Sequence, residues 1–195
     1  MNRIRPRLVT GVFLAAAWTL AIPSATAQSG DSESGEIAAF AGVGFTGASH
    51  AAFGGSAGMY FSRHGMALLE ASFMPMGTTT IQPWPAPATV RSSHLYDFAV
   101  DFHIRVPVRE RWEPYAIVGA AVLWNTVSQN SADSNGVAVV HHYDQFNGAL
   151  HTGGGLRYFV AKNWGIRPEV KVIVSKSIYT RISMGIFYVT PPDWP

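Results

Sequence analysis

The stretch that decides the fold is WGIRPEVKVIV, residues 164–174. Successive side chains of a β-strand point to opposite faces, so these residues divide into two sets. The first set is apolar, and it comprises Trp164, Ile166, Val170, Val172 and Val174. The second set is small or charged, and it comprises Gly165, Arg167, Glu169 and Lys171. The alternation continues through the hairpins between Phe146 and Val189. A membrane barrel and a soluble sandwich both give this pattern, so the rest of the chain must distinguish them.

The amino terminus has the features of a secretory signal peptide. Arg3, Arg5 and Arg7 precede an apolar run over Leu8–Ile22, and the small residues Ser24–Ala27 follow Pro23. We predict cleavage after Ala27, so that residues 1–27 form the signal peptide and the protein is exported. The alternative is an uncleaved anchor. It is disfavoured because the apolar run is shorter than the roughly 20 residues of a spanning helix.

Composition excludes several classes once the signal is set aside. The remaining chain has 11 Lys and Arg against 12 Asp and Glu, so no nucleic-acid or polybasic membrane-surface partner is indicated. Cysteine is absent, which excludes a small disulfide-stapled domain. No later apolar run approaches 18 residues, so a membrane-embedded form must be a closed β-barrel.

Eight strand candidates can be placed between a flexible segment at residues 28–35 and a Pro-rich tail at residues 191–195. They are Glu36–Phe45, Phe53–Phe61, Met66–Phe73, Ser93–Arg105, Tyr115–Trp124, Phe146–Phe159, Trp164–Val174 and Ile178–Val189. An even strand number suits a bacterial outer-membrane barrel. Short turns alternate with the long loops Met74–Ser92 and Asn125–Gln145, which is typical of periplasmic turns and extracellular loops.

The polar faces of these strands carry balanced charge. Five acids and five bases share them: Glu36, Glu70, Asp97, Asp101 and Glu169 with Arg105, Arg157, Arg167, Lys171 and Arg181. A soluble sandwich would turn these charges to water. The same faces are rich in glycine, as a narrow barrel interior requires, and aromatic residues cluster near the strand ends like interfacial girdles. We therefore predict a lumen ion-pair network that plugs the barrel, formed by Glu70, Asp97, Asp101, Arg105, Arg157, Arg167, Glu169, Lys171 and Arg181.

The carboxy-terminal third resembles the small outer-membrane β-barrels of the OmpA/OmpX type. The resemblance rests on GGGLRYFV at residues 153–160, on NWGIRPEV at residues 163–170 and on WEPY at residues 112–115. It implies an eight-stranded up-and-down barrel in the outer membrane of a Gram-negative bacterium. Contacts with lipid and lipopolysaccharide and insertion by the outer-membrane assembly machinery are implied too. The chain departs from this class at its end, where Phe187 and Tyr188 are followed by the Pro-rich tail instead of a terminal aromatic residue.

Candidate chemistry is sparse. His141, His142 and Asp144 suggest a metal site, but adjacent residues of an extended chain point apart, so a polar loop is the preferred interpretation. His103 and His151 fall on the inward face, either as a proton relay or as members of the ion-pair network. The His-x-Ser pair of lipid A deacylase barrels does not occur in the sequence, so no enzyme is predicted. The Pro-rich segment Ile81–Thr89 is either a recognition tip or a stiff loop.

Together these observations predict an all-β, eight-stranded, antiparallel transmembrane barrel with a structural, adhesive or surface-interaction role. A narrow channel or small-ligand carrier is the first alternative, and a soluble sandwich or lipocalin-like binder is the second. No cofactor, metal or nucleic acid is expected, and the extracellular partner stays open.

Overall fold

The described residues form eight β-strands. The structure is a computed structural model, and it describes residues 35–81, 89–106, 111–132 and 138–190. The strands are β1 (Gly35–Phe45), β2 (Ser49–Ser62), β3 (Gly65–Ile81), β4 (Thr89–Arg105), β5 (Trp112–Ala132), β6 (Ala138–Phe159), β7 (Trp164–Val174) and β8 (Ile178–Thr190). The predicted signal peptide, the segment at 28–34 and the Pro-rich tail lie outside the described residues.

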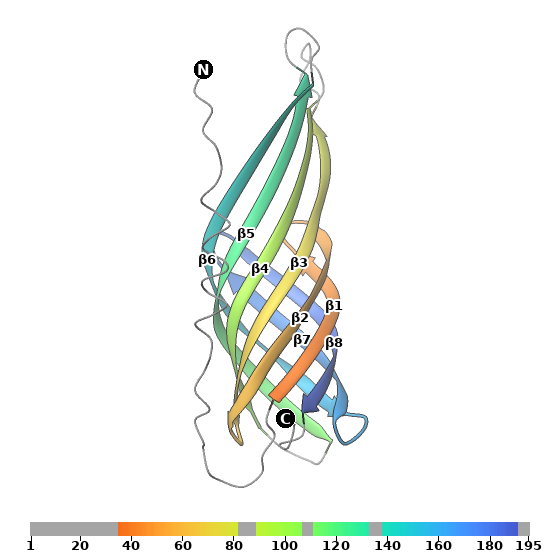
Figure 1. Ribbon diagram of the computed structural model, residues 1–195, viewed down its shortest axis with the longest axis vertical. Coiled ribbons are helices and arrows are strands. Elements are labelled where there is room, and N and C mark those ends of the chain that lie inside the picture. The colour runs from red at the N-terminus through yellow and green to blue at the C-terminus, as the bar shows by residue number, and fades with distance from the viewer. Residues whose placement is uncertain (1–34, 82–88, 107–110, 133–137, 191–195) are drawn as a thin grey trace. The chain divides into compact units, whose positions relative to one another are not determined.

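The strands close into one barrel. Each strand pairs antiparallel with the next, and β8 returns to pair with β1, so the topology is up-and-down (Figure 1). Closure leaves every strand of the ring with two neighbours. We call the end where β1 begins and β8 ends the base, and the opposite end the mouth. Within the described chain, no helix is long and apolar enough to cross a bilayer.

The predicted division of strand faces is confirmed. In β7 the buried residues are Gly165, Arg167, Glu169, Lys171 and Ile173, while Trp164, Ile166 and Val170 are exposed. β4 and β8 alternate in the same way. The charged side chains therefore point into the barrel, and the large apolar side chains point out of it.

Two aromatic rows bound the apolar outer surface. Near the mouth, four rings follow one another across neighbouring strands, from Phe73 through Tyr96 and Trp124 to Phe146, with centroids 5.1, 5.1 and 5.7 Å apart. Near the base, Trp112 packs on Tyr158 and Trp164 on Tyr188. On β5, the twelve steps from Trp112 to Trp124 span about 28 Å at ~3.3 Å per residue and a ~45° tilt, close to the apolar band of a membrane barrel. The outer surface is thus a lipid-facing belt.

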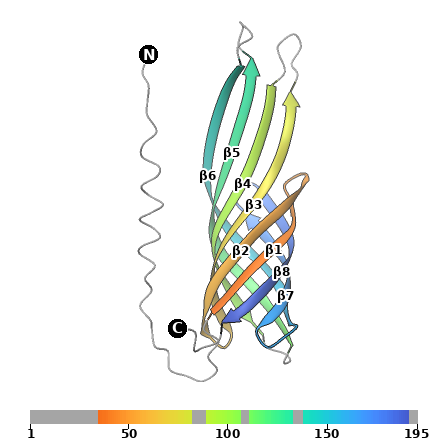
Figure 2. The ribbon, with the colours of Figure 1, turned by 45° about the vertical axis from the view of Figure 1, so that its right-hand side comes forward.

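Four strands continue past the mouth-side aromatic row, and here the predicted strand ends are wrong. The regions expected to be loops, Met74–Ser92 and Asn125–Gln145, are largely strand: β3 extends to Ile81, β4 begins at Thr89, and the β5–β6 hairpin stays paired from Trp124↔Phe146 to Ala132↔Ala138. Figures 1 and 2 show β3, β4, β5 and β6 extending beyond the ends of β1, β2, β7 and β8. We call the parts at 74–81, 89–95, 125–132 and 138–145 the protruding sheet.

The misprediction has a simple cause. Beyond the belt the outward face of a strand no longer meets lipid, and only the first inward residues, such as Met74 and Leu95, meet the barrel core, so the apolar alternation that marks a strand fades. A composition rich in Ser, Thr and Asn is then typical of a loop, although the backbone hydrogen bonds between the strands continue. Pro75 lies inside β3, at a register shift between Pro75 and Gly77, and Gly77 takes a positive φ of 89°. The rest of the predicted Pro-rich tip, residues 82–88, lies outside the described residues.

Candidate functional site

The barrel interior holds one set of buried charges, stacked between aromatic rings at the base and apolar side chains toward the mouth. All nine residues of the predicted network are inward-facing and at most 5% exposed. Charges removed from water to this degree require partners at close range. The pairs described below show how the barrel provides them.

Glu36 of β1 organises the base. Its Oε1 accepts a hydrogen bond from Arg167 at 2.8 Å, and its Oε2 accepts from Arg157 at 2.5 Å and from the Tyr60 hydroxyl at 2.9 Å. The Arg157 guanidinium also donates to Glu113 and lies 4.5 Å from the centre of the Phe187 ring. One carboxylate thus joins strands from opposite parts of the sequence.

Lys171 of β7 is the centre of the middle layer. Its ammonium lies 2.9 Å from both carboxylate oxygens of Glu70 and 2.6 Å from Oδ2 of Asp101. The side chain is fully buried. Arg181 of β8 shares Glu70, because its Nη2 donates to Oε1 at 2.7 Å. Two cations and two carboxylates from four strands therefore form one cluster.

Glu169 connects this cluster to the base. Its Oε2 accepts from the Tyr115 hydroxyl at 2.9 Å, and its Oε1 accepts from Arg181 at 3.3 Å. Arg167 lies 3.7 Å away on the base side. The polar series is therefore continuous along the barrel axis.

Asp97 and the two inward histidines complete the layer. The His151 ring lies 3.1 Å from Asp101 and 3.5 Å from Asp97, and Asp97 is 3.9 Å from Arg181. His103 makes a different contact, since it stacks on Tyr115 at 4.6 Å between ring centroids. His151 is thus a member of the acidic cluster, whereas His103 packs against an aromatic ring.

Apolar side chains cover the network toward the mouth. Met74, Leu95, Leu123 and Ile173 are buried together with four alanines, and Met76 and Tyr179 pack against them. These residues come from strands β2 to β7, with Tyr179 added from β8. An apolar layer, which includes the first residues of the protruding sheet, therefore covers the polar middle on its mouth side.

The structure brings most of the predicted network together and adds members that the predicted set did not include. Arg105 and Arg157 pair with Glu113, which lies between the predicted strands Ser93–Arg105 and Tyr115–Trp124. Arg157 also pairs with Glu36, which lies on the predicted polar face but outside the predicted set. Tyr60 and Tyr115 add hydroxyl donors. Strand alternation could have identified Glu113, because it lies two residues before the inward Tyr115.

The protruding sheet carries the three residues whose types suggest a metal site. His141, His142 and Asp144 lie on β6, not in a loop, and all three are exposed. His142 is 3.0 Å from the Ser128 hydroxyl, and Trp124 donates to Asp144 at 3.2 Å. Among the described residues, no group of three or more His, Asp and Glu is arranged to hold a metal ion.

The two edges of the protruding sheet differ. β7 pairs with β6 only from Leu150 toward the base, so Ala138–Ala149 forms an open edge. Along β6, Phe159 donates its amide to Arg111 on the β5 side, whereas Val160 donates to Trp164 and the Gly148 carbonyl accepts from Ser175. Even-numbered residues of β6 thus direct their backbone groups away from β5. The β3 edge is instead interrupted by Pro75 and the adjacent register shift.

Comparisons with known proteins agree on the fold. A family model described as "Outer membrane protein beta-barrel domain" matches residues 12–186. Neisserial surface protein A superposes with a TM-score of 0.53 at 16% identity, covering 83% of this chain and 100% of that one. Ail, the attachment invasion locus protein of Yersinia pestis, superposes with a TM-score of 0.51 at 11% identity, covering 80% of this chain and 95% of that one. A major outer membrane protein of Thermus thermophilus superposes with a TM-score of 0.59 at 10% identity, covering 80% of this chain and 99% of that one. No curated protein matches the sequence.

Proposed function

This chain belongs to the outer-membrane β-barrel family and resides in the outer membrane, and we propose that it is a non-enzymatic surface-interaction protein there. In this proposal the barrel is a plugged anchor and the protruding sheet is the binding element. One observation carries it: β5 continues eight residues beyond Trp124, or about 26 Å at ~3.3 Å per residue. A barrel that served only as an anchor would need no such extension.

The packed interior supports the anchor role. An eight-stranded barrel is just wide enough for its own side chains to fill it. Here the buried ion pairs fill the middle, and the apolar layer around Met74 and Leu123 covers them. Water and ions would have to displace both layers to cross.

The open β6 edge supports the binding role. Unpaired amide and carbonyl groups at a sheet edge are a template for another extended chain. Residues 138–149 contain no Lys, Arg or Pro that would block such pairing, whereas Pro75 obstructs the β3 edge. The partner that fits is an extended segment of a protein on another surface.

The proposal is tested by removing the sheet and keeping the barrel. Met74 is paired with Leu95 and Asn125 with Gln145, so residues 75–94 and 126–144 can each be replaced by a two-residue Asn-Gly turn. Bacteria displaying the trimmed chain should attach to cultured animal cells at least fivefold less than those displaying the full chain. Heat-modifiable gel mobility verifies that both barrels are folded. Equal attachment by the trimmed barrel would refute the proposal.

A matched pair of variants separates the edge from the rest of the sheet. His142→Pro removes an amide that points to the open edge, and His142→Ala removes the same side chain but keeps the amide. We expect the proline variant to lower attachment to the trimmed level and the alanine variant to leave it within twofold of the full chain. Equal effects would assign any binding to the sheet face.

A narrow channel is the second candidate, because the polar series from Glu36 to Asp101 is continuous along the axis. Planar bilayers distinguish the two. A plugged barrel gives no discrete conductance steps. Steps that Arg167→Gln or Glu169→Gln alters would favour the channel and refute the plug.

A further inference from the structure

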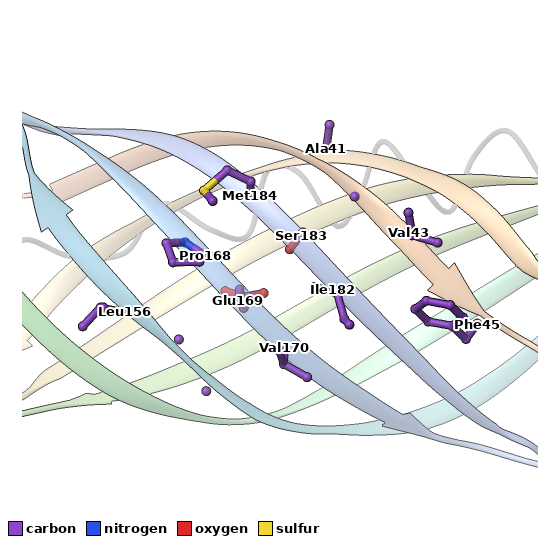
Figure 3. Close-up of a pocket in the computed structure, with 13 residues that line it drawn as sticks. Ala41, Val43, Phe45, Leu156, Pro168, Glu169, Val170, Ile182, Ser183 and Met184 are labelled. Carbon is purple, nitrogen blue, oxygen red and sulfur yellow. The ribbon is translucent and has the colours of Figure 1, made fainter.

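An apolar groove crosses the outer surface of the barrel over β6, β7, β8 and β1. Its volume is about 570 Å³. Val170, Ile182 and Val43 are in register across β7, β8 and β1, and Pro168, Met184 and Ala41 form the next row toward the base (Figure 3). Glu169 and Ser183 lie behind these rows with buried, inward-facing side chains. The groove is therefore lined by hydrocarbon.

The sequence explains why the surface is indented here. Ala41 and Gly154 have little or no side chain, whereas Phe45, Met184 and Leu156 project beside them. Pro168 stands in the middle of β7 and has no amide hydrogen, so the β6–β7 ladder lacks the pairs at residues 156 and 157 and resumes at Tyr158↔Ile166. Small residues and a flat ring thus replace the branched side chains that cover the rest of the belt.

The position of the groove limits what can occupy it. The Trp164↔Tyr188 pair of the base-side aromatic row lies two outward-facing rows below Pro168↔Met184, so the groove opens inside the lipid-facing belt. Neither Lys nor Arg lines it, so no partner for a phosphate or sulfate is present in its wall. A narrow concave surface fits a flexible hydrocarbon chain better than the convex wall of a second barrel.

We propose that this groove is a lipid-binding site, which holds one acyl chain of an outer-membrane phospholipid longer than the surrounding belt does. Apolar character alone does not distinguish the site, because the rest of the belt is equally apolar and hydrophobicity provides no preference within a bilayer. The gain comes from close packing on both walls of the groove, where each carbon contact adds a small dispersion term. Filling the groove should therefore abolish the preference without affecting the fold.

Native mass spectrometry of the full barrel, released from phosphatidylcholine nanodiscs into detergent, tests this inference. The unmodified barrel should retain one phosphatidylcholine. Ala41→Phe fills the groove and should lower the fraction carrying lipid at least fivefold. Ala120→Phe is the matched control, since Ala120 is an exposed, outward-facing alanine of β5 outside the groove, and it should retain lipid like the unmodified barrel.

A second measurement keeps the inference testable if Ala41→Phe does not fold. The chain has no cysteine, so Met184→Cys and Ala120→Cys each accept one fluorophore. Lipids brominated on the acyl chain should quench the label at residue 184 at least twofold more than the label at residue 120. Equal quenching, equal lipid retention by all barrels, or a dimer that Ala41→Phe dissociates would overturn the assignment.

Discussion

Lys171 provides the most direct test of the interior network. Its ammonium makes close contacts with three carboxylate oxygens, two from Glu70 and one from Asp101, and no part of the side chain is exposed. Lys171→Met keeps a side chain of similar length and leaves two buried carboxylates short of a cation. Removing one member of a buried ion pair typically costs about 3–5 kcal/mol.

The lower part of that range applies here. Arg181 still donates to Glu70 at 2.7 Å, and His151 still lies 3.1 Å from Asp101, so each acid keeps one partner. We therefore expect a loss of about 3 kcal/mol in the free energy of unfolding, roughly a 100-fold change in the folding equilibrium. The double variant Lys171→Met, Glu70→Gln removes one charge of each sign and should lose at least ~1 kcal/mol less than the two single losses added together.

Equilibrium urea unfolding of the refolded barrel in phospholipid vesicles measures these values, with tryptophan fluorescence and gel mobility as independent probes. Val172→Met is the matched control, because Val172 is the next residue of β7 and faces lipid. It should change stability by less than ~1 kcal/mol. If Lys171→Met is no more destabilising than Val172→Met, the buried ion pairs do not stabilise this barrel.

Three further predictions use the same assays. Tyr115→Phe removes the hydroxyl that donates a hydrogen bond to Glu169, and it should lower the free energy of unfolding in urea by about 1.5–3 kcal/mol. Tyr188→Phe on the lipid face should leave that free energy nearly unchanged, and equal effects of the two variants would contradict the assigned hydrogen bond. Gly119→Val should abolish the heat-modifiable gel shift, because a Cβ at Gly119 collides with the Val100 carbonyl and Asp101. The control Ala120→Val should fold and keep the gel shift. Trp124→Ala removes a ring that packs on Tyr96 and Phe146 and should lower stability by about 1–3 kcal/mol in vesicles; an unchanged midpoint would place the membrane boundary elsewhere.

The faces of the strands could be predicted because they follow from a local rule. Lipid on one side and packed side chains on the other impose a period of two on β7 and β8, and that period is visible in the sequence. The ends of β5 and β6 could not be predicted in the same way. Between Asn125 and Gln145 most side chains on both faces are polar or small and no regular apolar alternation remains, so only backbone pairing with the neighbouring strand, which the sequence does not display, makes the segment a strand.

The partners within the network were equally inaccessible, because they depend on how high each side chain lies in the barrel. Glu36 accepts from Arg157 and Arg167, which are 121 and 131 residues away in the sequence. Alternation assigns these side chains to the interior but says nothing about their level. That level is set by strand tilt and by the register of every intervening pair.

This dependence gives the charges a role that the apolar belt cannot fill. A slip of one residue between two strands turns apolar side chains inward and is opposed by the whole membrane. A slip of two residues keeps every apolar side chain in lipid, so the belt does not oppose it. The same slip moves Lys171 away from Glu70 and Asp101 by about 7 Å at ~3.4 Å per residue, and leaves buried charges without partners. The interior ion pairs therefore select the register among alternatives that the lipid accepts equally.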